Sequence, residues 1–190
     1  MTDADAAGAM SFIFEAGVLK RARRTGWWFA GNRDPESIAE HSFRVGIVGT
    51  VLAAMEGADP ARVALLGLLH DTQETRVTDI PHSARRYVTA ASNESVTADQ
   101  VAGAPQPVRD VIQAAVHEYE AGETAEALVA RDADKLECLV QAVEYREAGY
   151  LNVQPFIDSA LASLTTASAR RLAEQAVRGD TMMWQRTFRA

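Results

Sequence analysis

The sequence is short of cysteine and of long apolar runs. Cys138 is its one cysteine, so no disulfide can form within the chain. Its apolar neighbours at helical spacing, in "DKLECLVQAV", predict a small core residue rather than a reactive thiol. The start, "MTDADAAGAM", is acidic and lacks the basic region of a secretion signal. No apolar run reaches the ~20 residues that span a bilayer. These absences favour a cytoplasmic protein without a membrane partner.

Positive charge is also scarce. The chain has 19 Lys and Arg against 26 Asp and Glu, a formal charge of −7. Such a protein is not built for non-specific contact with a phosphate backbone, so we expect no polymeric nucleic acid as partner. A compact anionic substrate would need a local cation or a metal ion. The 190 residues, 47% of them hydrophobic, predict a single globular domain over 1–190.

Alternating β-branched residues are scarce too, and most windows show helical periodicity. We predict an all-α bundle of about seven or eight helices. Ser37, with Glu40 three residues on, predicts the start of a helix that ends at Gly57, and Asp59 followed by Pro60 predicts the start of the next. Other helices are predicted over residues 10–24, 82–88, 108–122, 124–149, 154–164 and 167–180. Residues 25–36 and 91–107 are predicted to be loops, the second on the surface, and residues 181–188 an apolar tail.

Four polar residues interrupt the apolar faces of these helices. His41 lies among Ile38 and Val45, His70 and Asp71 follow a run of leucines, and Asp134 precedes Leu136. Taken singly, each has an ordinary explanation, such as a hydrogen-bonded core histidine or a solvated carboxylate. A buried carboxylate without a partner is costly, however, and a cation relieves that cost.

Together the four residues form a set of two imidazoles and two carboxylates. Such a set suits one divalent ion such as Mn²⁺, Co²⁺, Fe²⁺, Ni²⁺ or Mg²⁺, and the absence of thiolates argues against a closed structural zinc site. On a six-coordinate ion it leaves two positions for water and substrate. Glu74 lies on the same helical side as His70 and Asp71, within reach of the outer shell of the ion. Asp79 follows on a turn that can bring it over the same site.

The order His41, His70-Asp71, Asp134 resembles the H…HD…D ligands of the HD-domain metal-dependent phosphohydrolases. Three longer stretches resemble the bacterial 5′-deoxynucleotidases and their eukaryotic relatives. They are "LKRARRTGWWFAGNRDPESIAEHSFRVG", "LLHDTQETRVTDIP" and "DADKLECLVQAVEYRE". The resemblance covers about residues 10–165 and leaves a C-terminal helix and tail, 166–190, outside it. The HD doublet alone is weakly specific, whereas the three stretches in this order are strongly specific.

The resemblance implies roles for individual residues. It makes His41, His70, Asp71 and Asp134 the metal ligands, with Asp132 the competing choice for the last. Glu74 and Asp79 match the catalytic carboxylates, and Arg24 and Trp27 match positions that shape the sugar and phosphate pocket. Other sequence features stand apart from these roles. Trp28 is a second aromatic residue after Trp27. Lys20, Arg21 and Arg23 form a cationic segment with Arg24, which either supplies local positive charge for the nucleotide or is a solvated helix face. We predict His82 and His117 to be surface or structural residues.

The function implied is hydrolysis of deoxynucleoside 5′-monophosphates to nucleosides and phosphate. We expect Glu74, ionised at neutral pH, to be the partner of the attacking water, and Asp79 to contact the leaving group or sugar. A nucleoside triphosphate triphosphohydrolase is the alternative and would need more cations. Hydrolysis of guanosine tetraphosphate is a weaker hypothesis, because Thr75 replaces the last Asp of the H-D-x-x-E-D motif of the enzymes that catalyse it. A non-catalytic nucleotide-binding protein is a further alternative. We would expect it to have lost some of the ligands or Glu74, and all of them are present. The resemblance also implies a homodimer or higher homo-oligomer, and the tail 181–188 is either an interface or core.

Overall fold

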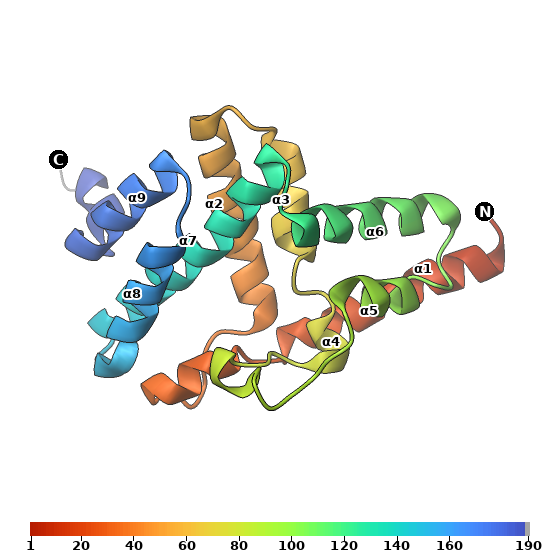
Figure 1. Ribbon diagram of the computed structural model, residues 1–190, viewed down its shortest axis with the longest axis horizontal. Helices are drawn as coiled ribbons and strands as arrows, with labels where there is room; N and C mark the ends of the chain where they lie inside the picture. Colours follow the sequence, from red (N-terminus) through yellow and green to blue (C-terminus); the bar gives the residue numbers. More distant parts are fainter. Residues whose placement is uncertain (189–190) are drawn as a thin grey trace.

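The computed structural model describes residues 1–188, apart from the side chain of residue 187. These residues form nine α-helices and no strand, which confirms the predicted all-α class (Figure 1). The α-helices are α1 (Asp3–Ala16), α2 (Ile38–Glu56), α3 (Pro60–Leu69), α4 (Glu74–Val77), α5 (Asn93–Gln100), α6 (Gln106–Ala121), α7 (Ala125–Glu147), α8 (Gln154–Ser163) and α9 (Ala167–Arg178). Five 3₁₀ segments lie between them or after them: η1 (Gly17–Lys20), η2 (Thr25–Ala30), η3 (His82–Ala84), η4 (Leu151–Val153) and η5 (Met183–Phe188).

Helices α2, α3 and α7 pack against one another and form the centre of the core. Helices α8 and α9 cover one side of α7, while α1, α5 and α6 extend to the other end of the molecule (Figure 1). Two glycines bring α2 and α3 close together. A Cβ atom on Gly49 would lie 2.8 Å from Val63 Cγ1, and one on Gly67 would lie 3.0 Å from Val45 Cγ1. This close approach holds the start of α2 near the end of α3, where the polar residues lie.

The predicted helix caps are confirmed. The Ser37 hydroxyl accepts from the Glu40 amide and the Glu40 carboxylate accepts from the Ser37 amide, which is a complete capping box. Helix α2 ends at Gly57, whose φ of 77° is left-handed. Asp59 caps α3 with Pro60 in its first turn, and Thr124 caps α7.

Three predicted boundaries are wrong. The first helix begins at Asp3 and ends at Ala16, because Thr2 and Asp5 form a capping box upstream of the apolar stretch that we used. The predicted loop 25–36 begins with the 3₁₀ segment η2. The third helix was predicted to run through His70 and Asp71 to Glu74, but it ends at Leu69. The Leu69 carbonyl accepts from both the amide and the hydroxyl of Thr72, so that His70 and Asp71 follow the helix.

The predicted surface loop 91–107 is also wrong, because it contains α5. Ser92 caps this helix, and Thr97 and Gln100 on it are buried. The Gln73 side-chain amide donates to the Thr97 hydroxyl over 2.7 Å, and the Gln100 side-chain amide donates to the Thr72 carbonyl over 2.9 Å. Polar side chains thus fix α5 against the segment that follows α3.

By length and composition, α2 is the one described helix that could cross a membrane, whereas the sequence predicted none. A core helix meets the same criterion, and α2 packs between α3 and α7. It also carries His41 and Arg44, whose polar groups contact α7. Its place in the core accounts for the buried part of its apolar composition.

Candidate metal centre and active site

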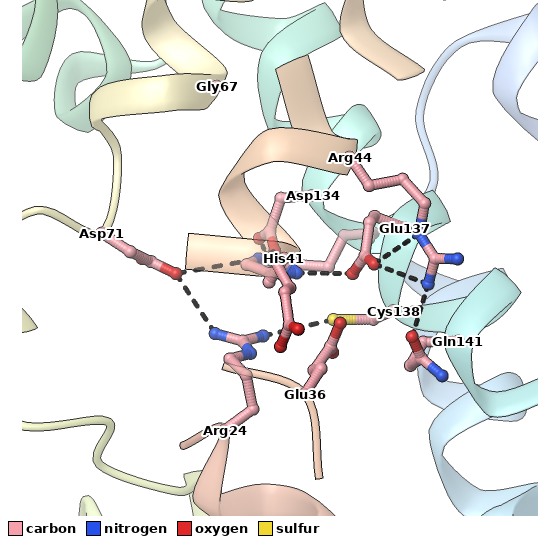
Figure 2. A network of polar contacts seen from close by, with 12 residues as sticks. Arg24, Glu36, His41, Arg44, Gly67, Asp71, Asp134, Glu137, Cys138 and Gln141 are labelled. Carbon is pink, nitrogen blue, oxygen red and sulfur yellow. Dashed lines mark hydrogen bonds and ion pairs between the residues drawn. The ribbon is translucent and has the colours of Figure 1, made fainter. Parts of the chain in front are cut away.

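Three separate elements bring the predicted ligands together. His41 comes from the first turn of α2, His70 and Asp71 from the segment after α3, and Asp134 from α7. His41 Nε2 lies 3.3 Å from Asp134 Oδ1 and 3.7 Å from Asp71 Oδ2. His70 Nε2 lies 3.1 Å from the same Asp71 oxygen and 3.9 Å from Asp134 Oδ1. Figure 2 shows Asp71, on the loop after α3, and Asp134, on α7, both near His41 on α2.

The second nitrogen of each imidazole has an acceptor for its proton. Nδ1 of His70 lies 2.8 Å from the Gly67 carbonyl, and Nδ1 of His41 lies 2.5 Å from Glu137 Oε2. A carbonyl or a carboxylate accepts only, so both Nδ1 atoms donate. The two Nε2 atoms are buried and make no hydrogen bond within the protein. Two unpartnered acceptors between two carboxylates fit a divalent cation.

The electrostatics of the pocket also favour positive charge at this point. Burial and Arg24 lower the pKa of His41, but the Glu137 and Asp134 carboxylates outweigh them and raise that pKa to about 10. Burial alone would raise the pKa of Asp71 and of Asp134, yet the two imidazoles and nearby cations hold both below their usual range. The carboxylates are therefore ionised and stabilise a cation bound beside them.

Asp132, the competing choice for the last ligand, is engaged elsewhere. Its carboxylate accepts from the Thr165 amide over 3.0 Å and from the Thr166 amide over 2.7 Å. The Thr165 hydroxyl donates to it as well, over 3.1 Å. These bonds hold the turn that precedes α9, whereas Asp134 faces the two imidazoles. The arrangement favours Asp134 as the ligand.

Glu74 is the first residue of α4, and its Oε2 is buried without a hydrogen-bond partner. Burial, followed by the charge of Asp71, raises the pKa of Glu74 to about 9. The protein's own groups therefore favour the protonated acid, so that the ionised carboxylate expected at neutral pH depends on the metal ion. A divalent cation held by the neighbouring ligands would lower this pKa, because nearby positive charge favours the carboxylate.

Asp79 lies on the turn after α4 and is tied to the start of η2. Its Oδ2 accepts from the amide and the hydroxyl of Thr25, and that hydroxyl also lies 2.8 Å from the Asp79 carbonyl. The preceding residue, Thr78, has a φ of 63°, which is unfavourable for a β-branched residue. A strained turn and Thr25 thus hold the Asp79 side chain at the wall of the cavity.

One cavity of about 610 Å³ contains these residues. It is lined by His70, Asp71, Glu74, Asp79 and Asp134, together with Arg24 and Trp27. Its volume is within the usual range for small-molecule sites. The Arg24 guanidinium reaches into it and donates to Asp71 Oδ2 over 3.2 Å and to Cys138 Sγ over 3.3 Å. Cys138 therefore lines the cavity instead of filling the core, although burial raises the pKa of its thiol, as expected for an unreactive cysteine.

Trp27 is a fixed wall of this cavity. Its ring lies 4.6 Å from Phe156 and meets Tyr145 edge-on at 5.1 Å, and its Nε1 donates to Glu36 Oε1 over 3.0 Å. Only 3% of Trp27 is exposed and Phe156 packs against its ring, so little aromatic surface is left on which a base could stack. Trp28 is 55% exposed and lies outside the cavity lining.

Comparisons with known proteins show the family to which the chain belongs. Residues 16–176 match the sequence model of the HD domain. The chain belongs to the HD-domain family. It is 32% identical to the 5′-deoxynucleotidase hdd1 of Schizosaccharomyces pombe over 67% of each chain. It is 29% identical to the 5′-deoxynucleotidase HDDC2 of Homo sapiens over 79% of this chain and 75% of that protein.

Solved structures of similar sequence have the same fold. A predicted metal-dependent phosphohydrolase from Magnetospirillum magnetotacticum superposes with a TM-score of 0.66 at 27% identity, covering 93% of this chain and 94% of that one. A conserved hypothetical protein from Pyrococcus furiosus gives a TM-score of 0.72 at 28% identity, covering 90% and 99%. The all-α HD-domain architecture predicted from the sequence is therefore confirmed.

The structure adds site residues of this HD domain that the sequence analysis missed. Lys135 Nζ lies 2.5 Å from Asp134 Oδ2, and the Tyr119 ring packs 5.2 Å from that of His70. Glu137 and Phe156 belong here too. The sequence could have indicated Glu137, because it lies one turn after Asp134 on the same face of α7. Of the two other histidines, His117 is 73% exposed and His82 lies at the exposed rim of the cavity.

Proposed function

We propose that this HD-domain protein is a metal-dependent 5′-deoxynucleotidase, which hydrolyses deoxynucleoside 5′-monophosphates to deoxynucleosides and phosphate. The observation that carries the proposal is the pair of buried, unpartnered Nε2 atoms of His41 and His70 between Asp71 and Asp134. His70, Asp71 and Asp134 line a cavity large enough for a nucleotide, and His41 lies buried behind them. Relatives that align with most of the chain carry the same activity in their names.

His41, His70, Asp71 and Asp134 would hold one divalent ion, of the group Mn²⁺, Co²⁺, Fe²⁺, Ni²⁺ and Mg²⁺. When bound, such an ion supplies Lewis-acid polarisation of a phosphoryl oxygen. Glu74 lines the cavity and has a buried carboxyl oxygen without a partner, so that its carboxylate can orient the attacking water and accept its proton. Asp79, held by Thr25, is placed to contact the leaving 5′-oxygen or the sugar.

Arg24 and Lys135 supply the positive charge that an otherwise acidic protein needs for a phosphate. Arg24 is anchored on Asp71, and Lys135 on Asp134, so both cations adjoin the proposed ligands. Two further arginines line the cavity, of which Arg85 is exposed to solvent. Arg131 donates to the carbonyls of Tyr119 and Glu120 over 2.9 Å and 2.7 Å. The cations near the ligands thus suit one phosphate group, which supports the monophosphatase over the triphosphohydrolase.

The test is a panel of nucleoside mono-, di- and triphosphates, in deoxy and ribo forms, incubated with Mn²⁺, Co²⁺ or Mg²⁺. We expect orthophosphate from deoxynucleoside monophosphates and its loss after chelation. Release of inorganic triphosphate from the triphosphates would favour the alternative enzyme. Failure to bind any of the three ions would overturn the metal-dependent function itself.

We also propose that the enzyme self-associates through α2. Four apolar side chains, each about half exposed or more, follow one another at intervals of four residues along this helix: Phe43, Ile47, Val51 and Met55. Such a stripe on a helix surface is typical of a protein interface. Light scattering should give at least twice the chain mass, and Val51→Glu should reduce it to one chain. A wild-type monomer at micromolar concentration would contradict this proposal.

A further inference from the structure

We propose that Glu137 is a positioning residue, which fixes the tautomer of the metal ligand His41 and is itself anchored by Arg44. The inference rests on the proposed metal-dependent function and extends it to residues outside the ligand set. Glu137 is completely buried, and both of its carboxylate oxygens are occupied by nitrogen donors. Oε2 faces His41 Nδ1 at 2.5 Å, and Oε1 accepts from Arg44 Nε at 2.8 Å.

The helical spacing explains why these groups meet. His41 and Arg44 are three residues apart on α2, and Asp134 and Glu137 are three residues apart on α7, so each pair lies on one helix face. Helix α7 therefore supplies one ligand directly and, one turn later, holds a second ligand that belongs to α2. Figure 2 shows Glu137 between His41 on one side and Arg44 on the other.

Arg44 is anchored further along α7. Its Nη2 donates to Gln141 Oε1 over 2.6 Å, and its Nη1 donates to both oxygens of Glu144 over 2.8 Å and 2.7 Å. The guanidinium thus cannot follow a movement of Glu137 without breaking bonds to two other side chains. Glu137 is held rigidly although it lies at the end of a side chain with three rotatable bonds.

The consequence concerns the proton on His41. The Glu137 carboxylate can only accept, so the imidazole places its proton on Nδ1 and turns the Nε2 lone pair toward Asp71 and Asp134. A carboxylate behind an imidazole ligand also increases its basicity. His70 is oriented by the neutral carbonyl of Gly67 instead, so the effect of a charged partner falls on His41 alone of the two.

The experiment compares Glu137→Gln with Glu144→Gln. Glu144 is the matched control, because Glu144→Gln changes a charge beside Arg44 but leaves the bonds of Arg44 to Glu137 and Gln141 and the contact of Glu137 with His41 in place. Binding of Mn²⁺ to each variant is measured by calorimetry in competition with a chelator. We expect Glu137→Gln to weaken Mn²⁺ binding by about 10–100-fold, the usual effect of losing such a partner, and Glu144→Gln by less than about twofold. Excess Mn²⁺ should restore turnover of Glu137→Gln, with the nucleotide KM unchanged.

A second measurement does not depend on how well the variants fold. In the wild-type protein loaded with the diamagnetic ion Mg²⁺, long-range ¹H–¹⁵N correlation should show the His41 proton on Nδ1 and none on Nε2. A proton on Nε2, or equal Mn²⁺ affinities for Glu137→Gln and Glu144→Gln, would overturn the role of Glu137. A wild-type protein that binds no divalent ion would instead overturn the proposed function, so the two failures are distinguishable.

Discussion

The guanidinium of Arg24 donates to Asp71 Oδ2 over 3.2 Å, and this oxygen is the one that faces both Nε2 atoms of the imidazole pair. A buried cation is therefore linked to a proposed metal ligand from the side where the phosphate is expected to bind. Burial lowers the pKa of Arg24, but the surrounding acidic groups, among them the carboxylates of Asp71 and Asp134, raise it well above its usual value. Its positive charge is consequently permanent.

We expect Arg24→Gln to lower kcat/KM by about 10²–10³-fold, because a charged donor near the phosphoryl oxygens is lost. The matched control is Arg23→Gln. Arg23 is adjacent in sequence but pairs with Asp34 at the surface, 2.7 Å away, so its removal should leave turnover within about twofold. Equal effects of the two substitutions in steady-state kinetics would show that Arg24 has no special role.

The two aspartates of α7 should separate metal binding from stability. Asp134→Asn should abolish measurable Mn²⁺ binding, because one of two ligand carboxylates is lost. Asp132→Asn should retain Mn²⁺ binding and cost about 2 kcal/mol of unfolding free energy, since hydrogen bonds to Thr165 and Thr166 lose their charge. Calorimetry and denaturant titration measure the two quantities. Loss of Mn²⁺ binding in Asp132→Asn with an unchanged unfolding free energy would reverse the assignment.

The sequence predicted those features of the fold that depend on residues close together in the chain. The capping box of Ser37 and Glu40, and the sharp end of α2 at Gly57, involve residues a few positions apart. The sequence pattern also marked the side chains that now converge in one cavity. Histidine and aspartate are unexpected on apolar helix faces, which made these residues stand out. Their order along the chain then matched that of the family's ligands.

Features that depend on distant partners could not be predicted in this way. Helix α5 has the composition of a surface loop, and its polar Gln100 is buried only because Thr72 and Glu15 accept from it. The role of Glu137 could not be predicted for the same reason. Its place on the face of Asp134 is visible in the sequence, but its partner His41 lies on another helix, 96 residues away in the chain.

Glu74 should affect chemistry more than metal binding. Its free oxygen lies in the cavity but the residue is separate from the four proposed ligands. We expect Glu74→Gln to lower kcat by about 10²–10⁴-fold, the usual contribution of a general base, while Mn²⁺ affinity changes little. Near-normal turnover of Glu74→Gln with Mn²⁺ bound would remove Glu74 from the proton transfer and leave Asp79 as the candidate.

The Glu15 carboxylate should make the fold sensitive to acid. It accepts from Arg76 over 2.7 Å and from Thr75 over 2.8 Å, which joins α1 to α4. The Arg76 bond outweighs burial and lowers the pKa of Glu15 to about 2. Because the folded pKa is below the ordinary value of 4.5, this carboxylate stabilises the fold above about pH 4.5 and loses that effect as the pH falls toward 2.

We therefore expect Glu15→Gln to reduce the unfolding free energy by about 1–2 kcal/mol at pH 7, where the charge-assisted bonds are intact. The difference between wild type and variant should shrink steadily between pH 5 and about pH 2. Urea titrations at pH 7, 5, 4 and 3 measure it. Glu94→Gln is the matched control, because its partner His117 is 73% exposed and the pair should contribute little at any of these pH values. A difference for Glu15→Gln that stays constant from pH 7 to pH 3 would mean that the Glu15 charge does not stabilise the fold.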